Sequence, residues 1–382
     1  MGAERIPLLV VAGEASGDLH GARLLEELHG LVGGVEAFGL GGEHLAAAGL
    51  DRVADSAEIS VVGLTEAFRI LPRARQIFDR ILEEVDRRRP RLAVLVDFPE
   101  FNLRLARALR QRGVRVVYYI SPQVWAWRRG RVRTIAELVD AMLVLFPFEA
   151  EFYRRHGVEA IHVGHPLVDE VPELPHVWDR GEPVGEPFQI ALLPGSRVNE
   201  IEALLPVMLA TVRLLAEEIP LFVRLIRAPT IPAAALEEAV ALAGLPVRIV
   251  PAAERAEAVA SSHVALCASG TATLEVGLLG TPMVVLYRLG SWTYLAGRLL
   301  VRLPYVSLVN LVLGRAVVPE LLQARAHPER VSAAVLALLR DPAAVAEMRR
   351  ALGELRGRLG ESGASARAAR EVAERLGAGV PA

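Results

Sequence analysis

The chain has 382 residues, more than one hydrophobic core usually serves, so we expect two domains. Apolar residues make up 52% of it and charged residues 23%, which excludes a disordered chain. The 43 basic and 45 acidic side chains leave a net charge of -2, which excludes the broad basic surface of a nucleic-acid-binding protein.

In chain order, the first half alternates short runs of Val, Ile and Leu with segments of helical periodicity, which predicts parallel strands joined by helices. Strands are expected at 6–11, 92–96, 114–120 and 142–145, and helices at 18–29, 66–88 and 101–111. The pattern resumes with strands at 189–193, 221–226, 247–250, 264–267 and 283–286, and residues 328–376 are expected to form two helices.

These elements predict an α/β protein with two doubly wound, Rossmann-like domains facing a cleft, followed by C-terminal helices. The expected boundaries are an N-terminal domain at 1–167, a Pro- and Gly-rich linker at 168–187 and a second domain at 188–340. The helices of 341–382 are expected to pack back on the N-terminal domain or to be exchanged in a dimer.

The cysteine count and the N-terminal sequence indicate the cellular compartment in which the protein is expected. Cys267 is the only cysteine, so it has no partner for an internal disulfide, and no His or Cys spacing typical of a metal site occurs. We therefore expect no metal and no cofactor. The N-terminus lacks the pattern of a secretory signal, and no apolar stretch reaches the roughly 18 residues of a membrane span. These features favour a cytoplasmic protein.

Two acidic motifs follow predicted strands of the first domain. Glu14 lies in a Gly-rich turn that ends at Asp18, and Asp97 comes directly after the strand at 92–96. Ligands of α/β sheets bind at the carboxyl ends of strands, so either acid could serve as a general base. The structural alternative is helix capping by Asp18 and Asp97. The glycines at 39–42 are more typical of a plain loop.

The segment 121–129 also follows a strand and carries Trp125 and Trp127 beside Arg128 and Arg129. Aromatic faces beside arginine would suit a sugar ring or an acyl chain. A packed loop is the ordinary alternative, and the spacing does not separate the two.

Two loops of the second domain have the features of phosphate sites. Gly195, Ser196 and Arg197 join a strand to a helix, and backbone amides together with a guanidinium favour oxyanions. A second loop combines small hydroxyl residues with a helix start and places Glu275 one turn into the helix, where it could accept both hydroxyls of a ribose. Its residues are Ser269, Gly270 and Thr271. Two such loops predict a nucleotide diphosphate.

Taken together, the segments 13–18, 97–102, 121–128, 193–197, 268–271 and 305–323 resemble the lipid-A-disaccharide synthase family, in order and over nearly the whole chain. The resemblance implies the two-domain glycosyltransferase B fold and inverting transfer of 2,3-diacylglucosamine. It makes 1–167 the acceptor- and lipid-binding domain and 188–340 the UDP-sugar-binding domain. The donor would be UDP-2,3-diacylglucosamine and the acceptor 2,3-diacylglucosamine 1-phosphate, giving a β-1,6-linked disaccharide and UDP. It also places Asn310 and Gln323 at the UDP moiety, and implies a cytoplasmic enzyme peripheral to the inner membrane and a possible homodimer.

Among the acids we expect Asp97 to be the base and Glu14 to orient the acceptor, with the exchanged assignment left open. The rival within the same fold is another UDP-sugar enzyme, such as the peptidoglycan N-acetylglucosaminyl transferase or a UDP-sugar 2-epimerase. A non-catalytic sugar-binding protein is the rival from another class.

The segment 59–78 combines bulky apolar residues with Arg69, Arg73 and Arg75, which predicts either a membrane-binding patch or a core-facing helix.

Overall fold

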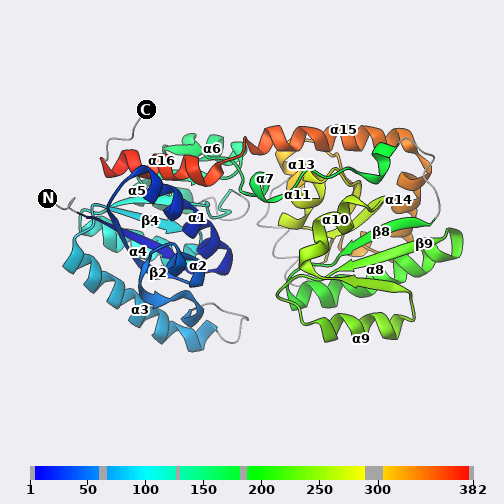
Figure 1. Cartoon of the computed structure of the whole chain (residues 1–382), viewed down its shortest axis with the longest axis horizontal. Helices are drawn as coiled ribbons and strands as arrows, with labels where there is room; N and C mark the ends of the chain where they lie inside the picture. The colour runs from blue at the N-terminus through cyan, green and yellow to red at the C-terminus, as the bar shows by residue number, and fades with distance from the viewer. Residues whose placement is uncertain (1–4, 60–66, 126–129, 181–186, 289–303, 378–382) are drawn as a thin grey trace. The chain divides into compact units, whose positions relative to one another are not determined.

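The computed structural model describes residues 5–59, 67–125, 130–180, 187–288 and 304–377 (Figure 1). It divides into two compact units, one made of Met1–Pro166 with Gly360–Ala382 and the other of Leu167–Leu359. The segment expected as a linker, 168–187, belongs to the second unit as far as it is described. The reason is local bonding, because His176 contacts the Thr281 hydroxyl at 3.1 Å and the Trp178 indole donates to the His263 carbonyl at 3.0 Å.

The first unit is built on a seven-stranded parallel sheet of order β3-β2-β1-β4-β5-β6-β7. The central strands β1, β4, β5 and β6 are almost wholly buried, as expected of a sheet covered on both faces. The strands are β1 (Ile6–Ala12), β2 (Val35–Gly41), β3 (Asp51–Asp55), β4 (Leu92–Val96), β5 (Arg115–Tyr119), β6 (Ala141–Val144) and β7 (Ala160–His162).

Helices cover both faces of this sheet. The apolar faces of α3, α4 and α5 share one buried cluster that includes Ile77, Leu105 and Ile135. Helix α16, from the end of the chain, packs beside α1, as Figure 1 shows in red and dark blue. The helices are α1 (Ala15–Leu31), α2 (Glu43–Ala47), η1 (Ser56–Glu58), α3 (Ala67–Arg88), α4 (Pro99–Gln111), α5 (Arg131–Leu138), α6 (Pro147–Arg154) and α16 (Ala364–Leu376).

The second unit repeats the design with a six-stranded parallel sheet of order β10-β9-β8-β11-β12-β13. Its strands are β8 (Phe188–Leu193), β9 (Leu221–Ile226), β10 (Val247–Val250), β11 (Val264–Ala268), β12 (Met283–Tyr287) and β13 (Glu320–Leu322). Its helices are α7 (Leu167–Glu170), η2 (Val177–Arg180), α8 (Val198–Glu218), α9 (Ala233–Ala243), η3 (Ala252–Glu254), α10 (Arg255–Ala260), α11 (Thr271–Leu278), α13 (Leu308–Leu313), η4 (Gln323–Arg325), α14 (Pro328–Arg340) and α15 (Pro342–Leu359).

Besides the segment 168–187, the fold differs from the sequence prediction in the C-terminal tail and in the strands β2, β3, β7 and β13, which were not among the expected strands. Gly39 and Gly41, expected in a plain loop, lie in β2, and a Cβ at Gly39 would come within 2.1 Å of the Val10 carbonyl oxygen. The strand therefore needs glycine in order to pair closely with β1. The tail at 328–376 forms three helices instead of two, because Pro342 ends α14 and opens α15.

In the described part of the chain, no helix combines the length and the apolar character that a bilayer crossing requires.

Candidate active site

The predicted acids of the first unit and the two phosphate-type loops of the second unit lie where the strand order of each sheet reverses, between β1 and β4 and between β8 and β11. Doubly wound sheets bind ligands at this position, beyond the carboxyl ends of the strands. Glu14 follows β1 and Asp97 follows β4, whereas Ser196 follows β8 and Ser269 follows β11. Each unit thus brings its two predicted motifs to neighbouring strand ends.

The backbone at Asp97 has an unusual conformation. Asp97 and Phe98 both have left-handed φ angles, +44° and +49°, which non-glycine residues rarely adopt. The Asp97 carbonyl accepts hydrogen bonds from the Asn102 amide at 2.7 Å and from the Tyr118 hydroxyl. Burial raises the pKa of Tyr118 well above its usual range, so this hydroxyl stays a donor. Two buried side chains therefore hold the strained turn that presents Asp97.

The glycine before Glu14 makes room for this turn. A Cβ on Gly13 would lie 2.2 Å from the Phe98 ring, so the ring lies over the end of β1 only because residue 13 is glycine. Burial, with a smaller contribution from the Glu14 carboxylate, raises the pKa of Asp97 to about 6. A carboxylate with this pKa holds a proton far better than an ordinary aspartate yet is ionised at neutral pH, which suits a general base.

The other two acids of the N-terminal motifs have structural partners. Asp18 accepts hydrogen bonds from the backbone amides of Gly42, His44 and Leu45 at 2.6 to 3.2 Å, so it caps α2 and not its own helix as the sequence suggested. Glu100 forms a two-fold ion pair with Arg131, at 2.7 and 3.0 Å. These partners leave Asp97 and Glu14 as the acids at the strand ends.

The tryptophan motif is a packed loop as far as it is described, and Trp127 lies outside the described residues. Trp125 is buried and donates its indole N–H to Glu149 at 2.9 Å, and the Ser121 hydroxyl donates to the same oxygen at 2.7 Å. Burial raises the pKa of Glu149 to about 7. Sequence reasoning missed Glu149, because nothing in an ordinary helix start (α6) signals that its carboxylate holds a loop far away in sequence.

The first phosphate-type loop of the second unit presents its amides to a carboxylate. The backbone N–H groups of Ser196 and Arg197 donate to Glu200 at 2.9 and 3.3 Å, and the Arg197 guanidinium contacts its other oxygen at 3.2 Å. Gly195 has φ +124°, and a Cβ there would meet Glu200 at 2.4 Å. The Arg197 side chain is 78% exposed. The loop therefore already holds one anionic group and has an accessible guanidinium.

The second loop follows β11. Gly270 has φ +149° and precedes α11, and the Ser269 hydroxyl donates to the Val306 carbonyl at 3.0 Å. Thr271 is the first residue of α11. Glu275, expected at a ribose, is nearly buried and forms an ion pair with Arg255 at 2.6 Å. Burial raises the pKa of Glu275 against the lowering effect of this arginine.

Asn310 lies in α13, and Gln323 begins η4 directly after the edge strand β13. Asn310 is 1% exposed. Its side-chain oxygen accepts from the Val317 and Val318 amides, and its side-chain nitrogen donates to the Val318 carbonyl and to the Glu320 carboxylate. Glu320 in turn accepts the backbone amides of residues 306 and 307, beside the carbonyl that binds Ser269. Asn310 is thus placed to support the Ser269 loop. Gln323, with φ +52°, directly follows β13.

Comparisons with known proteins identify the family. A family profile described as lipid-A-disaccharide synthetase matches residues 8–372. A lipid-A-disaccharide synthase of Myxococcus xanthus is 47% identical over 373 residues, covering 97% of both chains. One from Syntrophus aciditrophicus is 44% identical over 370 residues, covering 95% of this chain and 96% of the relative.

Solved structures agree on the fold. A UDP-N-acetylglucosamine 2-epimerase, described as putative, from Listeria monocytogenes superposes with a TM-score of 0.65 at 12% identity, covering 99% of this chain and 98% of the other. The glycotransferase of kitacinnamycin gives 0.60 at 18% identity, covering 99% and 100%. At these identities the likeness concerns the fold alone, the two-domain glycosyltransferase B architecture expected from the sequence. The full-length match shows that the chain belongs to the lipid-A-disaccharide synthetase family, whose glycosyl transfer in lipid A synthesis is therefore also its activity.

Proposed function

We propose that the chain transfers 2,3-diacylglucosamine from its UDP derivative to the 6-hydroxyl of 2,3-diacylglucosamine 1-phosphate, with inversion and release of UDP. The observation that carries the proposal is Asp97, a carboxylate of raised pKa. A strained turn holds it where the strand order of the first sheet reverses, between β1 and β4. A sugar hydroxyl is a poor nucleophile at neutral pH, so a base within hydrogen-bond reach must take its proton. Asp97 is this base, and Glu14 orients the acceptor.

The second unit binds the donor. The diphosphate lies against the loop of Ser196 and Arg197 and against residues 269–271, because amides at helix starts and a guanidinium stabilise the charge that develops on the leaving UDP. Glu275 lies at the ribose, and Asn310 and Gln323 serve the same UDP site. The diphosphate competes with Glu200 for the amides of Ser196 and Arg197, which that carboxylate occupies in the free protein.

Arg197→Ala tests the donor site. Removing one oxyanion-type donor should slow turnover by about 100-fold or more and weaken UDP binding. Arg248→Ala is the matched control, because Arg248 is also an exposed arginine of the second unit, paired with Glu254 at 3.0 Å. Full activity of Arg197→Ala would overturn the donor placement.

Product analysis tests the reaction itself. Mass spectrometry of a mixture of enzyme, donor and acceptor should show the disaccharide 1-phosphate, and UDP should accumulate only when the acceptor is present. An epimerase would change the donor sugar without any acceptor, and a binding protein would release no UDP. Either result would refute the proposed transfer.

The start of α3 supports a peripheral position on the inner membrane surface. Residues 60–66 lie outside the described residues, and the side chains of 67–70 are likewise not described. From Ile77 onward one face of α3 packs on the core, whereas Leu71 is 54% exposed and Arg75 is exposed one turn later. An apolar side chain beside arginine suits an anionic bilayer. The double variant Leu71→Ser with Arg75→Ser should reduce sedimentation with anionic liposomes.

Arg87→Ser, at the other end of α3, is the control for that experiment, since its side chain is also exposed. Equal sedimentation of the double variant and the control would favour the core-facing role for the whole helix. The homodimer stays a prediction. Light scattering of the purified protein would test it, and a monomer across the working concentration range would contradict it.

A further inference from the structure

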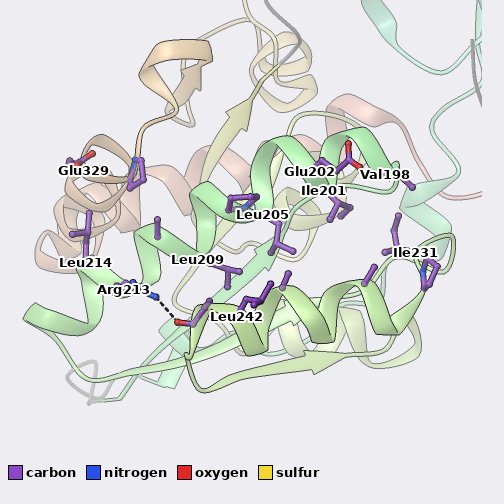
Figure 2. Close-up of a pocket in the computed structure, with 17 residues that line it drawn as sticks. Val198, Ile201, Glu202, Leu205, Leu209, Arg213, Leu214, Ile231, Leu242 and Glu329 are labelled. Carbon is purple, nitrogen blue, oxygen red and sulfur yellow. Dashed lines mark hydrogen bonds between the residues drawn. The ribbon is translucent and has the colours of Figure 1, made fainter.

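An apolar groove runs between α8 and α9 in the second unit (Figure 2). This open groove has a volume of about 710 Å³ and is lined mainly by aliphatic side chains, among them Val198, Ile201, Leu205, Leu209, Ile231 and Leu242. Val198 is 59% exposed and Leu242 is 81% exposed in the described part of the chain. A contiguous apolar surface of this kind marks a place where an apolar partner binds.

One end of the groove adjoins the loop that we assign to the donor diphosphate. Val198 is the first residue of α8 and directly follows Arg197. On the opposite wall, the Thr230 hydroxyl donates to the Ser196 carbonyl at 2.6 Å, and the next residue, Ile231, lines the groove. Figure 2 shows Val198 and Ile231 together at this end. The groove therefore begins beside the loop of Ser196 and Arg197.

The groove extends from there along the helices. In Figure 2, Leu205, Leu209 and Arg213 follow one another along α8 away from Val198. At the far end the Arg213 guanidinium donates to the Ala243 carbonyl at 2.7 Å. From Val198 to Arg213, α8 rises by about 22 Å. An elongated apolar groove of this length suits an extended alkyl chain better than a compact ring.

The chemistry of the donor supplies such a chain at this place. In a 2,3-diacylated sugar nucleotide, carbon 2 bears an acyl group and is bonded directly to the anomeric carbon, which carries the diphosphate. An acyl chain therefore starts only a few bonds from the phosphates, and it must lie on whatever surface adjoins the diphosphate loop. We propose that the groove between α8 and α9 binds one acyl chain of the donor. This proposal rests on the proposed placement of the donor diphosphate at Ser196 and Arg197.

The chain would enter between Val198 and Ile231 and lie along Leu205 and Leu209 toward Leu242. Burying the exposed part of these side chains against methylene groups is favourable in proportion to the apolar area removed from water. The groove would then contribute to donor affinity and to the choice of acyl length, without taking part in the chemical step.

Filling the groove tests the proposal. Ala239 lines it, so Ala239→Trp would occupy part of its volume, whereas Ala241→Trp adds the same side chain to an exposed position of α9 outside the lining. With a long-chain UDP-diacylglucosamine donor, Ala239→Trp should raise KM about tenfold, the loss expected when about two methylene groups stay in water. With a short-chain donor both variants should match the parent protein, and UDP should bind all three equally.

Equal KM values of the two variants for the long-chain donor would overturn the proposal. An equal rise in KM with the long-chain and the short-chain donor would also overturn it. A change specific to Ala239→Trp in liposome binding would assign the groove to a bilayer, and a change in oligomeric state would assign it to a second copy of the chain. If Ala239→Trp does not fold, the parent protein can be photolabelled with a donor that carries a diazirine at its acyl end.

Labelling should then fall within residues 198–214 and 231–243, and labelling elsewhere alone would refute the groove. Failure of the donor placement itself gives a different result. In that case Arg197→Ala would retain full activity and UDP affinity, whatever the groove variants do.

Discussion

A carboxylate that is kept partly buried for catalysis should lower the stability of the folded protein. One variant at Asp97 allows its cost in stability and its contribution to the reaction rate to be measured together. Its pKa is raised from 3.8 to about 6, first by burial and then by Glu14. Because the folded-state pKa lies above the unfolded-state value, the folded protein binds more protons between these values, and stability falls as pH rises through this window. A shift of about 2 units corresponds to about 3 kcal/mol above pH 7.

Asp97→Asn removes the charge and keeps the shape. The variant should therefore be more stable than the parent protein by up to about 3 kcal/mol at pH 8 and by about half of that at pH 5. Its maximal rate should fall about 100-fold to 10,000-fold, the usual contribution of a general base, with UDP affinity nearly unchanged. Urea denaturation at the two pH values and a UDP-release assay measure these quantities.

Glu100→Gln is the matched control, because Glu100 belongs to the same motif but its side chain is 63% exposed and paired with Arg131. It should neither gain stability nor lose most of the rate. The reasoning is refuted if Asp97→Asn is less stable than the parent protein at pH 8. It is equally refuted if the variant keeps more than about a tenth of the rate.

Two further predictions concern the same turn. Glu14→Gln removes a neighbouring negative charge, so the pKa of Asp97 should fall and the acid limb of the pH–rate profile should move from about pH 6 to lower pH. An unmoved limb would contradict this, and loss of activity in Glu14→Gln but not in Asp97→Asn would exchange the two roles. Asn102→Leu removes the amide that holds the Asp97 carbonyl, so kcat should fall about tenfold while the KM for the donor stays near the parent value. A raised KM with normal kcat would show that Asn102 acts on binding and not on the position of the base.

The order of the elements could be predicted because the sheets are parallel and buried. Continuous apolar runs such as 92–96 identify interior strands without any knowledge of their neighbours. The strand β2 was missed because its glycines resemble a loop. Tertiary contacts explain them, since a Cβ at Gly39 would meet the Val10 carbonyl oxygen and one at Gly41 would meet the Leu45 side chain. The C-terminal tail shows a second limit. Its helical periodicity indicates amphipathic helices, but the surface that buries α16, which is α1 at the other end of the sequence, is a tertiary property.

In the candidate site, local sequence determines the position of the acids and long-range contacts determine their chemistry. Asp97 and Ser196 are expected at strand ends from the strand pattern alone, since each comes within a few residues of an apolar run. The same pattern does not distinguish Asp97 from Asp18, because both are acids beside helix starts. Asp18 is bound by three amides of a segment more than twenty residues away, whereas the turn at Asp97 is held by Asn102 and Tyr118 through its backbone carbonyl. These two bonds engage the Asp97 carbonyl and not its carboxylate. Burial and the Glu14 charge raise the pKa of that carboxylate, which gives it the capacity to accept a proton.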